Sequence, residues 1–310
     1  MRIVYMGTPQ FALPGLKILL DHQYDLVSVV TAPDKPRGRG QEVSFTPIKE
    51  FALQRHIPIL QPASLGSPEF VNDLKRLEPD LIVVVAFRIL PKEVYTIPSR
   101  GAFNLHASLL PKYRGAAPIN WAIINGETET GVTTFFLQDR VDTGSVILQA
   151  RVKIGADETA GELHDKLSDV GAEIVLQTVR LIELGKASPR AQDDALASPA
   201  PKIFKDDCRI DWKKPATAVH NVVRGLSPHP CAWTTHAGKV IRIFRTDPQP
   251  AAPGQLTQPG SVVEVGKKNL TVATGQGVIS ILELQQEGRK RMGVEEFLRG
   301  YVLVPNDRFE

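Results

Sequence analysis

Short apolar runs, separated by stretches with helical spacing, make up the first half of the chain. The runs that we expect to form buried strands are residues 2–6, 26–31, 57–60 and 80–86. Between them, the apolar spacing predicts helices at 46–55 and 68–77. Thr8 and Pro9 are typical of the N-cap and first turn of a helix that reaches about residue 20. This alternation predicts an α/β fold with a doubly wound, mostly parallel, Rossmann-like sheet.

The pattern changes in the second half. Apolar residues at helical spacing predict one long helix over 159–184, and a stretch rich in Ala, Pro, Ser and Asp follows at 185–201. A short helix near 215–225 and a terminal helix at 294–301 enclose the runs that we expect to be short strands, 232–235, 239–245, 260–265, 269–274 and 278–284. Short strands separated by turns predict a small OB-like β-barrel. We therefore expect one domain at 1–185, a linker at 186–205 and a second domain at 206–310.

Composition narrows the class of protein. The chain has 310 residues, of which 42% are hydrophobic and 23% charged, as in an ordinary soluble globular protein. The longest clean apolar stretch, 81–87, is too short to span a membrane, and no signal peptide is visible at the N-terminus. Cys208, Cys231 and the scattered histidines lack the spacing of metal ligands, so we expect a cytoplasmic protein without a catalytic metal. Only Gly7 follows the first strand, which argues against a dinucleotide site.

The candidate catalytic residues are Asn104, His106 and Asp142. Asn104 and His106 lie two apart at the end of a short apolar run, so a strand would place both side chains on one face. Asp142 ends a second strand-like run, 131–137, and comes within reach of the imidazole if the two strands are neighbours. A carboxylate on a histidine fixes its tautomer and raises its basicity, and an amide supplies a donor for a developing oxyanion. These groups suit the transfer of an acyl group between nitrogens.

Each of these motifs is common when it stands alone. Asp-Thr-Gly is a frequent turn, because Asp tolerates turn geometry and Gly supplies positive φ. The loop 108–115, with the sequence Ser-Leu-Leu-Pro-Lys-Tyr-Arg-Gly, changes this assessment. It has neither helical nor strand periodicity, and packing alone does not explain its mixture of residues.

A second loop, 33–47, carries Lys35, Arg37 and Arg39 among glycines. It is long for a connection between a strand and a helix, and long irregular loops are often functional. One interpretation is a solvated surface loop, and the other is a basic arm that contacts a phosphate backbone. The surplus charge of the whole chain, +3, lies in the segment 206–310, which indicates an anionic partner there as well.

Taken together, these segments resemble the methionyl-tRNA formyltransferases, a family of folate-dependent formyltransferases. The similar segments are 7–12, 33–49, 104–118, 142–144, 209–212 and 286–292, so that the resemblance covers essentially the whole chain. One departure is visible: the family often has Ala-Tyr-Gly-x-Ile-Leu-Pro where this chain has Ala-Phe-Arg-Ile-Leu-Pro at 86–91, one residue shorter.

The resemblance implies transfer of the formyl group of 10-formyltetrahydrofolate, a co-substrate, to the α-amino group of methionine on initiator tRNA. Asn104 and His106 are then the donors to the oxyanion, and Asp142 holds the histidine or positions a water that accepts the amine proton. The residues implied on the folate side are Phe87, Arg88, Ile89, Leu90, Ser108, Leu109, Leu110, Pro111 and Asp139. Those implied on the tRNA side, toward the acceptor stem, are Lys35, Arg37, Arg39, Lys213, Lys214, Arg289, Lys290 and Arg291. The family also implies a monomer.

Other acceptors remain open. A glycinamide ribonucleotide formyltransferase shares the catalytic trio, but the second domain and the basic loop argue against it. A formyl hydrolase or an amino sugar nucleotide formyltransferase is closer in layout, but we expect the former to carry an aldehyde dehydrogenase domain and the latter a decarboxylase domain as well. A tRNA-binding protein without catalysis is a further alternative, and the intact Asn104, His106 and Asp142 argue against that.

Overall fold

The computed structural model describes residues 1–37, 42–250 and 258–310, which form two compact units. The first unit comprises residues 1–116, 129–153 and 164–200, and the second comprises residues 117–128, 154–163 and 201–310. The second unit therefore includes two short segments that the sequence analysis assigns to the first domain.

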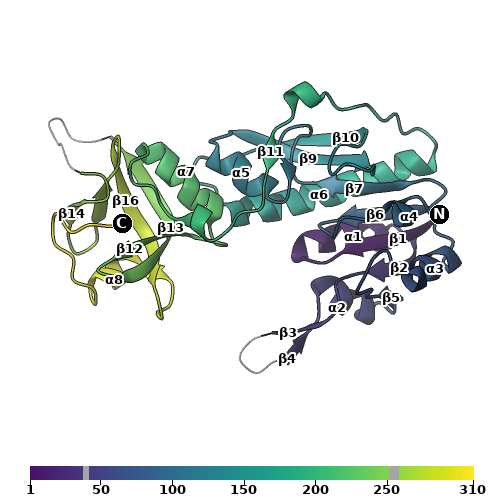
Figure 1. The fold of residues 1–310 in the computed structure, drawn as a ribbon, viewed down its shortest axis with the longest axis horizontal. Coiled ribbons are helices and arrows are strands. Elements are labelled where there is room, and N and C mark those ends of the chain that lie inside the picture. The colour runs from purple at the N-terminus through teal and green to yellow at the C-terminus, as the bar shows by residue number, and fades with distance from the viewer. Residues whose placement is uncertain (38–41, 251–257) are drawn as a thin grey trace. The chain divides into compact units, whose positions relative to one another are not determined.

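A seven-stranded sheet is the centre of the first unit, in the order β10-β9-β7-β6-β1-β2-β5 (Figure 1). Its strands are β1 (Arg2–Gly7), β2 (Asp25–Val30), β5 (Ile59–Leu60), β6 (Leu81–Val85), β7 (Ala102–His106), β9 (Glu129–Phe136) and β10 (Val146–Lys153). The five strands from β7 to β5 run parallel, whereas β9 is antiparallel to β7 and β10 is antiparallel to β9. The predicted doubly wound, mostly parallel sheet is confirmed, and β10 is an edge strand that the sequence analysis missed.

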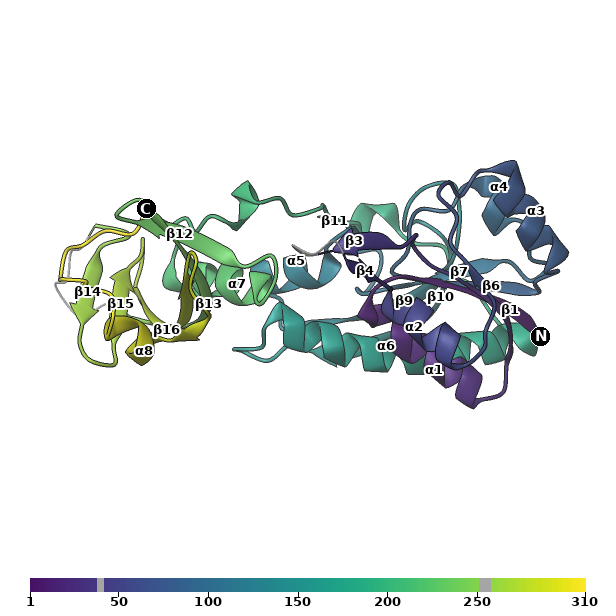
Figure 2. The ribbon, with the colours of Figure 1, turned by 90° about the horizontal axis from the view of Figure 1, so that it is seen from below.

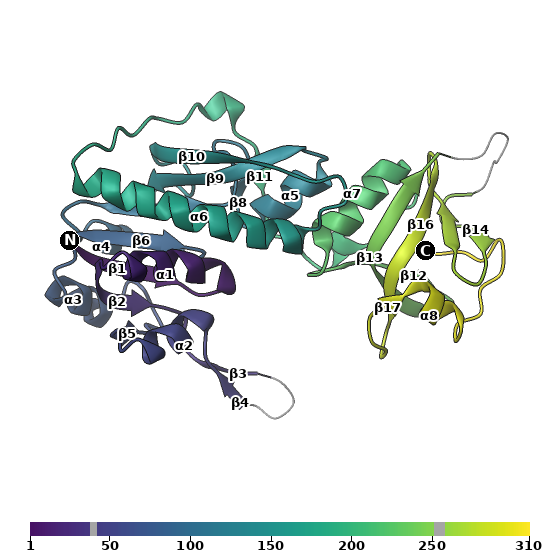
Figure 3. The ribbon, with the colours of Figure 1, turned by 180° about the vertical axis from the view of Figure 1, so that it is seen from behind.

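Helices cover both faces of this sheet. They are α1 (Leu13–Asp21), α2 (Pro47–Gln54), α3 (Pro68–Arg76), α4 (Lys92–Tyr95) and the long α6 (Ala160–Glu183). Figure 2 shows α1, α2 and α6 on one face and α3 and α4 on the other, and Figure 3 shows α6 along the sheet from behind. The central strand β6 is completely buried because it lies between the two layers.

Local sequence explains where the helices begin. Thr46 and Ser67 cap α2 and α3 by accepting hydrogen bonds from backbone N–H groups three residues on, and a proline follows each cap. The prediction that Thr8 and Pro9 begin the first helix is wrong. A 3₁₀ turn, Gln10–Ala12, comes first, and α1 begins at Leu13 because Pro14 has no N–H and fits only in a first helical turn.

The second unit is built on an antiparallel sheet in the order β12-β13-β16-β15-β14, with β17 paired to β16. Its strands are β12 (Ala232–His236), β13 (Lys239–Gln249), β14 (Val262–Val265), β15 (Leu270–Ala273), β16 (Val278–Gln286) and β17 (Met292–Gly293). The helices of this unit are α5 (Pro118–Ile124), α7 (Ala216–Leu226) and α8 (Val294–Leu298). The predicted C-terminal β domain is confirmed. A separate hydrophobic core fills it, including Val223, Ile241 and Phe297.

The segment predicted to be a linker lies in contact with the first unit. Arg190 forms a pair of backbone hydrogen bonds with Val146, and the short strand β11 (Pro199–Ala200) pairs with β8 (Arg114–Gly115). A 3₁₀ turn, Asp194–Leu196, lies between these contacts. Residues 190–200 therefore form a strap along the first unit. The remaining short strands, β3 (Lys35–Arg37) and β4 (Glu42–Ser44), form a hairpin.

Among the described residues, no helix has both the length and the apolar character needed to cross a membrane.

Candidate active site

Asn104 and His106 lie at the carboxyl end of β7, where the parallel strands of the sheet end together. β7 pairs with β6 on one side and β9 on the other, and Asn104 is opposite Val84 and Phe135. The two-residue period places both side chains on one face, as the sequence predicts. The side-chain amide of Asn104 is partly buried and makes no hydrogen bond to any residue that the structure describes. It is therefore available to a substrate.

The His106 imidazole is buried, and the contacts of its two nitrogens assign them different roles. Nε2 lies 2.8 Å from the backbone oxygen of Tyr113. A carbonyl only accepts, so Nε2 carries a proton and donates it there. Nδ1 lies 3.7 Å from Oδ2 of Asp142, which is too far for a hydrogen bond. Tyr113, rather than Asp142, fixes the tautomer, and Nδ1 is the nitrogen that is free to meet a substrate.

Asp142 is held from both its side chain and its backbone. Its Oδ2 accepts a hydrogen bond of 2.9 Å from the N–H of Gly115, and its carbonyl accepts one of 2.9 Å from the side chain of Gln192. Its φ of 55° is in the left-handed region, which a non-glycine residue adopts only when its surroundings impose it. The side chain is mostly buried, with an exposed fraction of 11%. Asp142 is therefore fixed close to the Nδ1 side of His106.

Gln192, on the strap, connects several parts of this site, and the sequence analysis missed it. Its Nε2 donates to the carbonyls of Asp142 and Gly144, and its Oε1 accepts two hydrogen bonds from the guanidinium of Arg114. Arg114 also forms an ion pair of 2.7 Å with Asp194. Arg114 lies between Tyr113, which contacts His106, and Gly115, which contacts Asp142. By holding Arg114, the strap therefore supports both His106 and Asp142.

Comparison with known proteins identifies the family. The sequence profile described as formyl transferase matches residues 1–179, and that described as formyl transferase, C-terminal domain, matches residues 202–302. A methionyl-tRNA formyltransferase of Caldanaerobacter subterraneus is 48% identical over 97% of both chains. A methionyl-tRNA formyltransferase of Bacteroides fragilis is 46% identical over 98% of this chain and 96% of its own. The chain belongs to the methionyl-tRNA formyltransferase family.

The fold is also found in formyltransferases outside this family. An N-formyltransferase from Helicobacter canadensis, solved with folinic acid and dTDP-3-aminofucose, superposes with a TM-score of 0.68. The two sequences are 20% identical, and the superposition covers 90% of this chain and 98% of the Helicobacter chain. At this identity the likeness shows the fold alone.

Within this member of the family, the residues expected on the folate side follow β7 and β6. The first group, 108–111, follows β7. The hydroxyl of the buried Ser108 donates a hydrogen bond of 2.6 Å to the carbonyl of Lys112, and the Leu110–Pro111 peptide bond is cis. Thr133 of β9 accepts from the N–H of Leu110, and its hydroxyl donates to the carbonyl of Ser108. Leu109 is partly exposed. This loop is therefore fixed against the sheet.

The second group, 87–90, follows β6. The guanidinium of Arg88 donates to the carbonyls of Pro62 and Ala63 and lies over the Phe87 ring at 5.3 Å. Burial lowers the pKa of Arg88. Leu90 is in the core, whereas Ile89 is 75% exposed. In this one-residue shorter loop, Arg88 is used to tie the loop to the segment after β5.

Asp139, the last residue expected on the folate side, is exposed. It accepts a hydrogen bond from the hydroxyl of Tyr95, which raises the pKa of Tyr95, and lies 4.0 Å from the ammonium of Lys92.

The cations expected on the tRNA side fall into three groups. Lys35 and Arg37 lie on β3, and Arg39 is outside the described residues. Lys213, Lys214 and Arg289 are exposed and have no ion pair with any described residue. Lys290 and Arg291, in contrast, pair with Glu296 and Glu283, the latter through two hydrogen bonds. Arg291 also lies over the Phe244 ring at 4.3 Å.

Within the part of the chain that the structure describes, no group of three or more His, Cys, Asp or Glu side chains has the arrangement of a metal site.

Proposed function

We propose that this protein transfers the formyl group of 10-formyltetrahydrofolate to the α-amino group of methionyl initiator tRNA. The observation that carries the proposal is the Asn104–His106–Asp142 arrangement at the end of β7 in a chain that is 46–48% identical to methionyl-tRNA formyltransferases. The relative solved with folinic acid supports a folate as the formyl donor for this fold.

The chemistry begins with the neutral amine of methionine. Its nitrogen attacks the formyl carbon, the C=O π electrons move to oxygen, and a tetrahedral intermediate forms. The oxyanion then collapses, the bond between carbon and N10 of the folate breaks, and the proton lost by the amine ends on N10. Formylmethionyl-tRNA and tetrahydrofolate are the products.

Asn104 and His106 stabilise the oxyanion in this proposal. The amide of Asn104 has no other partner among the described residues, and Nδ1 of His106 is free because Nε2 is bound to Tyr113. A protonated imidazole donates from Nδ1 to the oxyanion. Such a donor typically contributes about 3–4 kcal/mol to lowering the barrier. Among the described residues, Oδ2 of Asp142 accepts one hydrogen bond, from Gly115, so it has lone pairs left for a water that takes up the amine proton.

The folate side of the site is proposed to be lined by 108–111, 87–90 and Asp139, and the tRNA acceptor stem to contact the basic groups. Among these, Lys35 and Arg37 lie on β3, and Arg39 is outside the described residues. In the C-terminal unit, Lys213, Lys214 and Arg289 have no ion pair with any residue that the structure describes. Lys290 and Arg291 are the weaker candidates because each already has a carboxylate partner. We further propose the domain limits 1–185, 186–205 and 206–310, a monomer, and a cytoplasmic location suited to translation initiation.

The decisive experiment offers the purified protein 10-formyltetrahydrofolate with one amine acceptor at a time. Methionyl initiator tRNA is expected to be formylated. Methionyl elongator tRNA, glycinamide ribonucleotide and an amino sugar nucleotide serve as competing acceptors. Faster transfer to either small amine than to methionyl-tRNA would contradict the proposal.

A further inference from the structure

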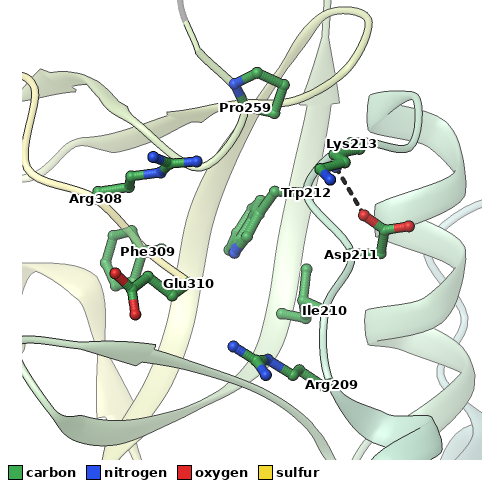
Figure 4. A pocket seen from close by; sticks show the side chains of 9 residues that line it. All are labelled: Arg209, Ile210, Asp211, Trp212, Lys213, Pro259, Arg308, Phe309 and Glu310. Carbon is green, nitrogen blue, oxygen red and sulfur yellow. Dashed lines mark hydrogen bonds between the residues drawn. The ribbon is translucent and has the colours of Figure 1, made fainter.

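An open pocket with a volume of about 540 Å³ lies on the C-terminal unit, and its lining includes no residue assigned above to catalysis. Three segments wall it: residues 209–213, Pro259 and residues 308–310. In Figure 4, Arg308 lies on one side of Trp212 and Lys213 on the other, with Arg209 below them. Arg209 and Trp212 belong to the Arg-Ile-Asp-Trp segment, for which the proposed mechanism has no use.

The wall is held in place by backbone hydrogen bonds. The N–H of Ile210 donates 2.8 Å to the carbonyl of Trp233, and Glu310 forms a reciprocal pair with Thr235. The N–H of Phe309 also donates a hydrogen bond of 2.8 Å to the carbonyl of Gly260, whose own N–H donates to the carbonyl of Ala273. The positions from which the side chains project are therefore set before any ligand arrives, which lowers the entropic cost of binding.

Three cations project from this wall, and none has a carboxylate at ion-pair distance among the described residues: Arg209, Lys213 and Arg308. The guanidinium of Arg209 is kept in place by the ring of Trp233, 5.6 Å away. Of the two acidic residues in the wall, Asp211 already accepts a hydrogen bond of 3.0 Å from the N–H of Lys213. The three cations are therefore the donors of this wall that have no ion pair with a described residue, and they are two guanidinium groups and one ammonium group.

The floor of the pocket restricts what the cations bind. Trp212 is 5% exposed, because its ring packs against Phe309 and its indole N–H donates to Thr234. A nucleobase needs an open aromatic face to stack on, and this floor offers none. A ligand that meets cations at the rim and a covered floor is recognised through its phosphate rather than its base.

We infer that this pocket binds a phosphate group of an RNA strand, with Arg209, Lys213 and Arg308 as its donors. The inference rests on the proposed function, since it supplies a second, sequence-independent contact of the C-terminal unit with the tRNA body. It adds Arg209 and Arg308, which the sequence analysis did not assign, to the RNA-contacting residues.

The test uses the full chain and the variants Arg308→Gln, Arg209→Gln and the double variant. We expect Arg308→Gln to weaken tRNA binding about three- to tenfold and to reduce the slope of log affinity against log salt by roughly 0.7–0.9, the amount for one phosphate contact. The Michaelis constant for formyl-folate and the turnover at saturating tRNA should not change. A duplex RNA of unrelated sequence should show the same loss, because a phosphate contact does not read bases.

Arg299→Gln is the matched control. Arg299 is an exposed arginine of the same unit, but it already pairs with Glu295 at 2.9 Å, so its loss should leave the salt slope unchanged. If Arg209→Gln unfolds the unit, as circular dichroism would show, Arg308→Gln still decides the question. Unchanged RNA affinity and salt slope in Arg308→Gln overturn the inference, as does binding of inorganic phosphate that depends on Arg308 while RNA binding does not. A wild-type protein that formylates no tRNA would refute the proposed function instead, and the RNA-binding measurement would still stand.

Discussion

In the first unit, backbone groups hold His106 and Asp142 in place, whereas several cations of the second unit have no ion pair with any described residue. His106 and Asp142 are each held by a backbone group of the segment 113–115, and Gln192 holds that segment and Asp142 together. In the second unit, Arg209, Lys213 and Arg308 project around a pocket without an ion pair among the described residues.

This difference follows from the task proposed for each unit. A donor lowers a reaction barrier only if it points at the developing charge before the reaction starts, so its supports must be rigid. A phosphate backbone is recognised by charge, which demands a less exact geometry. A cation that is already paired with a carboxylate is partly neutralised, so it contributes less to the affinity for a phosphate. The number of partners therefore separates the supported pair His106 and Asp142 from the cations proposed to contact RNA, whereas Asn104 has no hydrogen bond to a described residue and is left for the substrate.

The largest expected effect is in the first unit. His106→Ala and Asp142→Asn should each lower the formylation rate by about a hundredfold or more, because each removes a member of one coupled pair. Combined, their effects should be far from additive. The measurement is kcat with both substrates saturating.

His164→Ala is a suitable control for this experiment. His164 also lies beside a carboxylate, with Nδ1 2.9 Å from Asp165, but on the surface. Near-normal turnover in His106→Ala, or an equal loss in His164→Ala, would refute the catalytic assignment.

The strap gives the next largest effect. Gln192→Leu removes the donor to two carbonyls of the Asp142 turn and the acceptor of Arg114, so the carboxylate loses its fixed position. A misplacement of about 1 Å can cost on the order of a hundredfold, and we expect kcat to fall about 10- to 100-fold with little change in either Michaelis constant. Gln192→Glu keeps the acceptor and loses the donor, and should be intermediate only if both ends of the side chain matter.

Asp194→Asn provides the comparison, since Asp194 binds the same Arg114 but is 71% exposed. Its effect should be small. A Gln192→Leu enzyme with unchanged kcat would show that the strap is not a support of the site.

The sequence predicts the catalytic pair better than its supports, and the reason is distance along the chain. Asn104 and His106 share a face because of the two-residue period of a strand, which is a local property. Gln192 contacts Arg114 across 78 residues, in a stretch whose composition is typical of a linker. No local pattern marks such a residue, because its role depends on β11 pairing with β8.

The elements of the fold divide in the same way. β6, with five buried apolar residues, is evident from its sequence. The edge strand β10 mostly alternates partly buried and exposed positions, so its sequence lacks a clear apolar run. The predicted start of α1 is wrong because a 3₁₀ turn competes with the helix there. The tautomer of His106 was also assigned to Asp142, although a backbone carbonyl, which has no sequence signature, sets it.

A smaller effect is expected within the second unit, where two adjacent cations, Arg289 and Lys290, differ in whether a carboxylate lies at ion-pair distance among the described residues. Arg289 has no ion pair among the described residues, and Lys290 lies 3.2 Å from Glu296. Arg289→Gln should weaken tRNA binding a few-fold and reduce its salt slope by roughly one unit at most. Lys290→Gln should change both quantities less, because the lost ammonium is already partly neutralised. Equal effects at the two positions would mean that pairing does not predict which cations bind RNA.

The smallest effect concerns a polar group of the second unit that is tied as firmly as those of the first. His220 of α7 is buried, with Nε2 3.3 Å from the carbonyl of Ala156 and Nδ1 3.0 Å from the hydroxyl of Thr246. Burial, the largest cause, lowers its pKa below the ordinary 6.5. The hydrogen bond to Ala156 opposes this, as do Asp157 and Asp247, whereas Arg224 adds to it. The folded state therefore favours the neutral ring. As the pH falls below about 6.5, the unfolded chain takes up a proton more readily than the folded one, and the free energy of unfolding decreases.

His220→Gln keeps a donor and an acceptor but does not titrate, so its unfolding midpoint should fall less steeply between about pH 7 and pH 5 than that of the wild type. Each kcal/mol lost in this range lowers the midpoint by about 2–4 °C for a protein of this size class. His229→Gln, at an exposed position of the same unit, controls for removal of a histidine. Identical pH profiles for His220→Gln and the wild type would show that the buried ring does not contribute to acid sensitivity. A flatter profile for His220→Gln alone would show that this buried ring makes the second unit sensitive to acid.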